Sequence, residues 1–182
     1  VVSKSRKLIK HINILKSFGM NKSSYNRKNE KKNWHYNIKS IGANYRMTEI
    51  QAAFGIQQLK KVNIFKIKKN QISKFYKKNL DKKQLFFQSS NFTYSSALIY
   101  FQVIFKKSKI RNLIAKHLNK NKIGISVHWD PILEKHDIFK TKKFSKNSYD
   151  LSKKILSIPL YPSLKRSDQI KIIKIINSYF KN

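Results

Sequence analysis

Two stretches of the first half of the chain repeat their hydrophobic residues at helical spacing. Between Ser3 and Phe18 apolar side chains recur every three or four positions, and Gly19 stands where such a helix can end. Either Ser3 or Ser5 can cap its start. The residues from 20 to 41 are mostly polar, with Trp34 and Tyr36 as large anchors. The pattern therefore predicts a helix followed by a long excursion, and the opening Val-Val pair is typical of the end of a strand.

A longer helical pattern follows. Thr48 and Gln51 have the spacing of a capping box, and the apolar positions behind them predict one long amphipathic helix that ends near residues 79–81. The second half of the chain alternates between the two periods. Strands are expected at 85–87, 97–105 and 123–129, and helices at 110–118, 148–156 and 168–180. Pro159 and Pro162 separate the last two helices, and Ser167 is the expected cap of the closing one. The order of elements predicts the α/β class, with a small α/β layer packed against the long helix.

The charge of the chain adds a second possible function. The 41 Lys and Arg residues against 8 Asp and Glu give a formal net charge of +33, which attracts polyanions at low salt. A nucleic-acid-binding protein is therefore an alternative. The lysines, however, run through almost every segment and do not gather in one stripe, as a binding footprint does. We interpret them mainly as compositional drift, which makes nucleic acid an unfavoured partner.

Several kinds of site are excluded by what the sequence lacks. It contains no Cys, so disulfides, thiolate metal sites and a cysteine nucleophile are ruled out. No metal-spaced histidine cluster, phosphate loop or nucleophile elbow is present. No run approaches the roughly 20 apolar residues of a membrane span. The sequence thus predicts neither a metal site nor membrane insertion.

Two segments can carry binding groups. In residues 42–53 a Gly-containing loop with Asn44 and Arg46 enters a capped helix, whose first N–H groups suit an anion. On the local features alone, an ordinary N-capped helix with a turn before it is the favoured interpretation. In residues 124–131 a predicted strand ends in His128, Trp129 and Asp130 just before a proline. A histidine there is often structural and a tryptophan is often part of the core, so these alternatives stay open.

Taken together, the motifs resemble one known family. The segment GANYRMTEIQAAFGIQQLKKVNIF resembles the G-x-N-Y-R-M/L-T-E/D-I-Q-A-A signature of DegT/DnrJ/StrS-type sugar aminotransferases. LKSFGM, WHY, IGISVHWDPI and DLSKKILSIPLYPSLKRSDQ resemble further segments of the family in the same order. The resemblance implies the C-terminal part of a fold-type I aminotransferase. It divides the chain into the end of the large cofactor domain with an interface loop (1–47), a long connecting helix (48–80) and a small C-terminal α/β domain (81–182).

The resemblance also implies an activity. Such enzymes are cytoplasmic homodimers that use pyridoxal phosphate to move an amino group from glutamate to a keto-sugar linked to a nucleotide. Within the family, this sequence best resembles the subgroup that makes 4-amino-4,6-dideoxy sugars for surface glycans. Asn44 corresponds to the residue that binds the cofactor phosphate of the partner subunit, with Tyr45 and Arg46 beside it. Four residues correspond to the segment near the nucleotide-sugar, namely Val127, His128, Trp129 and Asp130.

The departures from the family pattern limit what the chain can do. The resemblance places the Schiff-base lysine before Val1, and none of the lysines present stands in its context. We therefore expect no catalytic residue in this chain and no turnover by it alone. The segment 95–100 lacks the histidine that the family often has in the small domain. An inactive partner subunit of an intact aminotransferase is a further alternative.

Overall fold

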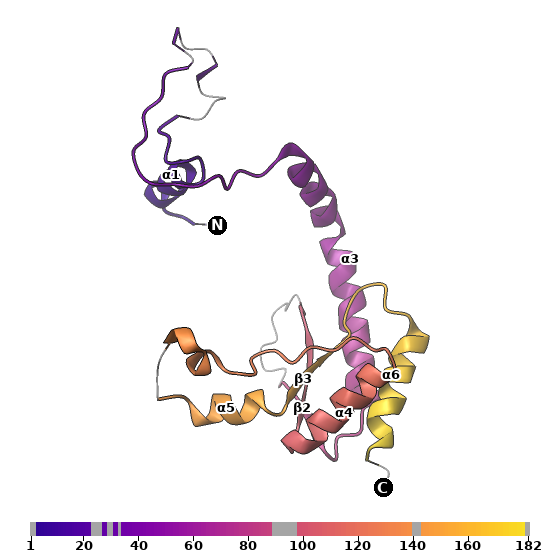
Figure 1. Ribbon diagram of the computed structural model, residues 1–182. Helices are drawn as coiled ribbons and strands as arrows, with labels where there is room; N and C mark the ends of the chain where they lie inside the picture. The colour runs from indigo at the N-terminus through magenta and orange to yellow at the C-terminus, as the bar shows by residue number, and fades with distance from the viewer. Residues whose placement is uncertain are drawn as a thin grey trace. The chain divides into compact units, whose positions relative to one another are not determined.

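The computed structural model describes residues 3–22, 27, 28, 31, 32, 34–88, 98–139 and 143–180 of the 182-residue chain. The residues form two compact units, Val1–Lys60 and Lys61–Asn182, whose boundary lies inside the long helix (Figure 1). The expected Val-Val strand end and the segment 95–97 lie outside the described residues. The division at 47 and 80 that the resemblance implies stays a prediction.

The first unit is built around helix α1 (Arg6–Leu15). Its N-cap is Ser5, whose side chain accepts a hydrogen bond from the backbone N–H of Leu8 at 3.3 Å. This confirms one of the two expected caps, although the helix is shorter than residues 3–18. Beyond α1 the chain returns alongside it, with bridges between Met20 and Ile38 and between Ser17 and Asn44.

Helix α3 (Glu49–Asn79) confirms the long helix. Its start is the predicted capping box: the N–H of Thr48 donates to Gln51 Oε1 at 2.9 Å, and the N–H of Gln51 donates to Thr48 Oγ1 at 3.3 Å. Both bonds use residues three positions apart, so the sequence specifies this end of the helix locally.

The first half of α3 differs from the expected amphipathic pattern. Ile50 is 84% exposed and Leu59 is 71% exposed. Nine residues separate them, about two and a half helical turns, so they face opposite sides of the helix. Phe54 is also 67% exposed. An apolar surface all round a helix is typical of one that is covered on more than one side.

The second unit is an antiparallel sheet covered by helices. Strands β1 (Leu85–Phe87), β2 (Phe101–Phe105) and β3 (Ile155–Ile158) lie in the order β1-β2-β3. Helix α4 (Ser108–Lys120) packs on β2 and β3 and also contacts α6 (Arg166–Ser178). Figure 1 shows these two helices beside the C-terminal half of α3. Asn177 ties α6 to the end of α3, because its amide donates to Asn79 O at 2.8 Å and accepts from the N–H of Asp81 at 2.9 Å.

One hydrophobic core joins these elements. Tyr76 of α3, Phe105 of β2, Leu118 of α4 and Ile176 of α6 are each fully buried. Along β2 the burial alternates, as expected for a sheet with one covered face. The predicted packing of a small α/β layer against the long helix is therefore confirmed for the second half of α3.

Three expectations for the second unit were wrong. The strand expected at 123–129 is reduced to a single bridge between Ser126 and Ser157, and Trp129 at its end has a left-handed backbone. The helix expected at 148–156 is α5 (Lys146–Ser152), and its last residues belong instead to β3, which is buried throughout and pairs with β2. Lys165 is the N-cap of α6, and Ser167 lies inside the helix.

Candidate functional site

The loop that carries Asn44 is held against the end of α1 by main-chain bonds. The N–H of Ala43 donates to Leu15 O at 2.9 Å, and the N–H of Phe18 donates back to Ala43 O at 3.1 Å. The N–H of Tyr45 donates to Lys16 O at 2.9 Å. Asn44 lies between these bonds, so its backbone position is fixed by residues far from it in sequence.

Two glycines permit this close approach. A Cβ atom on Gly42 would lie 2.5 Å from both Leu15 O and the nitrogen of Gly19. Gly19 itself has a φ of +74°, and a Cβ there would lie 1.7 Å from Ser40 O. No side chain fits at either position without moving the backbone. The glycine two residues before Asn44 is therefore part of what positions the loop.

The Asn44 side chain is exposed on this loop. Its Oδ1 accepts a hydrogen bond from Arg46 Nε at 3.2 Å, and no other hydrogen bond of this side chain is found within the described part of the chain. The guanidinium of Arg46 lies 5.7 Å from the centre of the Phe18 ring. The Asn44 amide N–H groups and the remaining Arg46 N–H groups thus form an exposed donor pair. Tyr45 is 79% exposed.

The start of α3 contributes less to this site than the sequence suggests. The N–H groups of Thr48 and Gln51 are already satisfied within the capping box. Glu49 places a carboxylate in the first turn, where it competes with an incoming anion for the positive helix end. An anion at this loop would be bound by Asn44 and Arg46, and the helix end plays a secondary part.

In the second predicted segment, residues 124–131, Ser126 exchanges two main-chain hydrogen bonds with Ser157, at 3.1 and 2.9 Å. Val127 is half-buried and packs against the core. The His128 ring lies 4.3 Å from the Tyr100 ring, centre to centre, with 44° between their planes. Its Nε2 atom is buried and has no hydrogen-bond partner among the described residues. A buried imidazole nitrogen without a partner is costly, and a bound ligand can satisfy it.

Trp129 presents an exposed aromatic side chain in this segment. Its backbone φ is +68°, and the side chain is 60% exposed. The indole borders a cavity of about 360 Å³ whose other walls are mostly apolar, formed by Ile132, Leu133, Leu151 and Ile155. This volume lies at the lower end of the roughly 300–1,000 Å³ of small-molecule pockets. A flat ring beside an apolar cavity suits the stacking of a planar ligand group.

Asp130, in contrast, is engaged inside the protein. Its carboxylate contacts Arg111 Nη2 at 3.0 Å and Lys153 Nζ at 2.6 Å. The hydrogen bond from Lys153 and then that from Arg111 hold the pKa of Asp130 below its ordinary value, against the opposing effect of burial. The same contact raises the pKa of Lys153. Asp130 was expected to contact the substrate, and its carboxylate is bonded to these two side chains in the structure. The contact with the substrate stays a prediction.

Sequence reasoning missed Arg111 and Lys153. A signal for Arg111 was present, because it shares the buried face of α4 with Ile114 and Leu118. A charged residue on an apolar helix face predicts a buried partner. The partner could not be identified from sequence, since Asp130 lies in a loop and Lys153 follows another helix.

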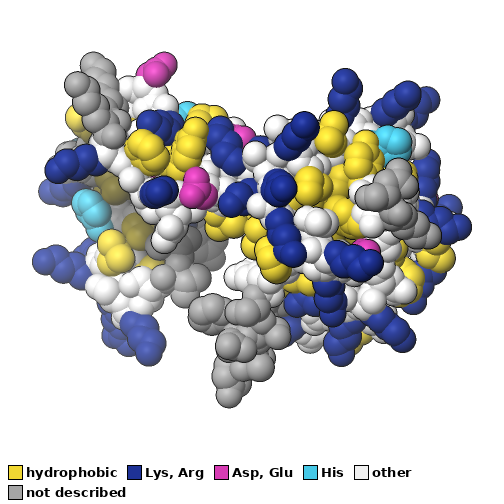
Figure 2. Space-filling model, turned by 90° about the horizontal axis from the view of Figure 1, so that it is seen from below, with side chains coloured by type: hydrophobic (Ala, Val, Ile, Leu, Met, Phe, Trp, Pro, Cys, Tyr) yellow, Lys and Arg dark blue, Asp and Glu magenta, His cyan; other side chains and the backbone are white. Residues whose placement is uncertain are grey.

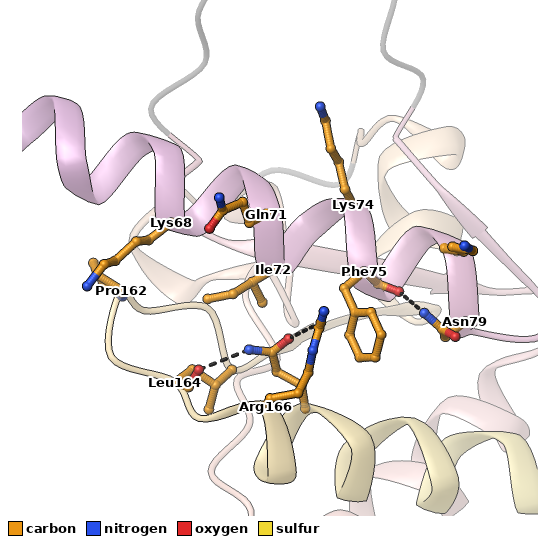
Figure 3. A pocket seen from close by; sticks show the side chains of 11 residues that line it. Lys68, Gln71, Ile72, Lys74, Phe75, Asn79, Pro162, Leu164 and Arg166 are labelled. Atoms are coloured by element: carbon orange, nitrogen blue, oxygen red, sulfur yellow. Dashed lines mark hydrogen bonds between the residues drawn. The ribbon is translucent and has the colours of Figure 1, made fainter.

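A larger cavity of about 820 Å³ lies between the second half of α3 and the start of α6 (Figure 3). The Arg166 guanidinium lies 3.4 Å from the centre of the Phe75 ring and donates to Gln169 Oε1 at 3.1 Å. Gln169 in turn donates to Leu164 O at 2.9 Å. None of the predicted site residues lines this cavity.

The surface charge is spread widely. Lys and Arg side chains are scattered over the face shown in Figure 2 and do not form one stripe. Within the described residues, no group of three or more His, Asp or Glu side chains is placed to hold a metal ion. Among the helices that the structure describes, none combines the length and the apolar character that crossing a membrane requires.

The chain is similar to proteins of one known family. The model of the DegT/DnrJ/EryC1/StrS aminotransferase family matches residues 1–177. The spore coat polysaccharide biosynthesis protein SpsC of Bacillus subtilis is 27% identical over 93% of this chain and 46% of its own length. The UDP-4-amino-4,6-dideoxy-N-acetyl-beta-L-altrosamine transaminase of Campylobacter jejuni is 30% identical over 74% of this chain and 34% of its own.

The solved structure of PseC from Helicobacter pylori, an aminotransferase involved in the biosynthesis of pseudoaminic acid, superimposes with a TM-score of 0.83. The two sequences are 22% identical, and the match covers 99% of this chain and 48% of that one. This likeness confirms the expected fold, part of an aminotransferase subunit. The chain spans about half the length of the curated relatives it matches.

Proposed function

The chain belongs to the DegT/DnrJ/EryC1/StrS aminotransferase family, and from that premise we propose that it is part of a pyridoxal-phosphate enzyme that transfers an amino group from glutamate to a nucleotide-linked keto-sugar. The name of the Campylobacter jejuni relative supports a 4-amino-4,6-dideoxy sugar as the product type. The name of the Bacillus subtilis relative supports a role in surface polysaccharide synthesis.

The observation that carries the proposal is the donor pair of Asn44 and Arg46. Asn44 is exposed, and its backbone is fixed against α1 by main-chain hydrogen bonds. Arg46 donates to Asn44 Oδ1, which leaves the amide N–H groups of Asn44 as donors for a ligand. Such a pair fits a phosphate group, which accepts charge-assisted hydrogen bonds. Because the site faces outward, we propose that it binds the cofactor phosphate of a second copy in a homodimer.

The bound cofactor supplies the electron sink for transamination. The residues of this chain supply binding and orientation. Asn44 and Arg46 hold the phosphate, with Tyr45 beside them. Val127, His128 and Trp129 face the nucleotide-sugar, where the free Nε2 of His128 and the exposed indole are the groups suited to a polar atom and a ring. We propose that the 182 residues do not turn over by themselves.

The binding of pyridoxamine phosphate by the chain tests the proposal. Pyridoxal phosphate itself is a poor probe, because its aldehyde reacts with lysines and the chain is rich in them. We expect Asn44→Ala to weaken pyridoxamine phosphate binding, measured by calorimetry at physiological salt, by about tenfold, or about 1.4 kcal/mol. Pyridoxamine, which lacks the phosphate, should bind weakly to both proteins.

A matched control is Asn63→Ala, which changes an exposed asparagine of α3. Both substitutions leave the net charge unchanged, so a difference between them cannot come from the general attraction of a +33 chain for phosphate. Equal affinity of the wild type and Asn44→Ala for pyridoxamine phosphate would contradict the proposed phosphate site.

A further inference from the structure

The loop that carries Trp129 is anchored at both ends. At its start Ser126 is bonded to Ser157 of β3 through two main-chain hydrogen bonds. At its end Asp130 is bonded to Arg111 of α4 and to Lys153, which follows α5. The three residues between these anchors include His128 and Trp129, so the anchors determine where both rings lie.

Arg111 is the central residue of the second anchor. It is 5% exposed, its Nε donates to Lys153 O at 2.9 Å, and its Nη2 donates to Asp130 Oδ2 at 3.0 Å. One planar guanidinium thus joins a main-chain carbonyl to a carboxylate, a geometry that the single ammonium of a lysine does not reproduce. The chain uses Arg at only five positions against many lysines, which agrees with a geometric requirement here.

Trp129 needs this anchor because its backbone is unfavourable. A non-glycine residue with a φ of +68° lies in the left-handed region, which is unfavourable for a side chain with a Cβ atom. Such a conformation persists where its surroundings fix it. Asp130, the next residue, is held by its bonds to Arg111 and Lys153, and Trp129 lines the cavity of about 360 Å³.

We propose that Arg111 and Lys153 are positioning residues for the nucleotide-sugar site, and that through Asp130 they hold the Trp129 indole as the platform on which the nucleobase stacks. The inference rests on the proposed function for the identity of the ligand. The positioning of Trp129 by Arg111 does not depend on the proposed function, because it follows from contacts within the second unit.

Tryptophan fluorescence tests both statements. The chain contains Trp34 and Trp129, so the substitution Trp34→Phe leaves Trp129 as the single reporter. In this background we expect UDP or GDP, added at physiological salt, to quench the Trp129 emission. Arg111→Met should shift the emission without ligand and weaken nucleotide binding by about tenfold. Arg111→Lys should show smaller changes in emission and in nucleotide binding than Arg111→Met. Lysine keeps the positive charge but cannot bond both Lys153 O and Asp130 Oδ2 as the guanidinium does.

The matched control is Arg166→Met, which removes the same charge from another arginine of the second unit. It should leave the emission and the quenching unchanged. Should Arg111→Met unfold the protein, as judged by circular dichroism, Lys153→Met replaces it, since that side chain is 38% exposed and its removal disturbs the core less.

The outcomes separate the two proposals. An unchanged Trp129 emission in folded Arg111→Met or Lys153→Met overturns the positioning role. A shifted emission together with no quenching of the wild type by UDP or GDP supports the positioning of Trp129 and overturns the nucleobase platform. Quenching that responds equally to Arg166→Met identifies charge attraction alone and also overturns the platform.

Discussion

Gly42 and Leu15 approach each other so closely that a Cβ atom on the glycine would lie 2.5 Å from the main-chain oxygen of the leucine. The N–H of the following residue, Ala43, donates to that same oxygen at 2.9 Å. The contact joins the end of α1 to the loop that presents Asn44. The backbone position of Asn44 in the proposed phosphate site therefore depends on Gly42.

We expect Gly42→Ala to displace this loop. The added methyl forces the backbone apart, which costs about 1–3 kcal/mol locally. Amide hydrogen exchange should show lost protection of the N–H groups of Ala43 and Tyr45, and pyridoxamine phosphate should bind more weakly. The control is Gly55→Ala in α3, where nothing lies within 4 Å of the added Cβ. Gly55→Ala should stabilise the helix by up to about 1 kcal/mol. Equal hydrogen exchange at Ala43 and Tyr45 in the two variants would contradict the packing role of Gly42.

The anchor of Trp129 should weaken in acid. The pKa of Asp130 lies below its ordinary value of 3.8 in the folded protein. Its contribution to stability is therefore complete above 3.8 and is lost as the pH falls through the lower folded value. In the Trp34→Phe background the Trp129 emission should stay constant from neutral pH down to about pH 4 and change below it. Asp130→Asn should remove that acid transition, and persistence of the transition in this variant would assign it to another group.

The hydroxyl of Tyr76 gives a test of the core of the second unit. It donates to Pro159 O at 3.2 Å, and burial, ahead of the charges of Tyr161 and Asp168, raises the pKa of Tyr76. Tyr76→Phe leaves the carbonyl without its donor, so urea unfolding should show a loss of about 1 kcal/mol. A raised folded pKa means that stability is complete below the ordinary value of 10.0 and falls as the pH rises above it.

Tyr76→Phe should therefore reduce the alkaline loss of stability. The control is Tyr161→Phe, which changes a tyrosine that is 47% exposed and should alter stability by less than about 0.5 kcal/mol. Equal losses in the free energy of unfolding from the two substitutions would show that the Tyr76–Pro159 hydrogen bond contributes no more to stability than an exposed tyrosine hydroxyl.

The exposed apolar side chains of α3 predict self-association. Phe54 and Leu59 are 67% and 71% exposed, and removing such surface from water stabilises a contact by about 25 cal/mol per Å². Sedimentation velocity should show species larger than a monomer as concentration rises, and the double variant Phe54→Ser, Leu59→Ser should reduce them. Lys60→Ser with Lys61→Ser is the matched control, and a monomer at every concentration would count against the homodimer.

The sequence by itself determined the features whose signals lie within a few residues of one another. The capping box of Thr48 and Gln51 and the cap at Ser5 appear as predicted, because hydrogen bonds between residues three positions apart decide them. The strand at 85–87 was predicted from its apolar and aromatic residues, although its partner is β2. The ordered motifs were likewise enough to identify the family, which the match over residues 1–177 confirms. The roles of Asn44, Tyr45, Arg46, Val127, His128, Trp129 and Asp130 stay predictions.

Tertiary structure decided what depends on distant partners. Ile155 and Leu156 were predicted to end a helix, yet they begin the strand β3, because β2 offers this segment hydrogen bonds and the core buries its side chains. Asp130 was predicted to contact the substrate, and only the structure shows that Arg111 and Lys153 bond its carboxylate. In both cases the deciding energy comes from pairing and desolvation between residues separated in sequence, and no local pattern encodes such a pairing.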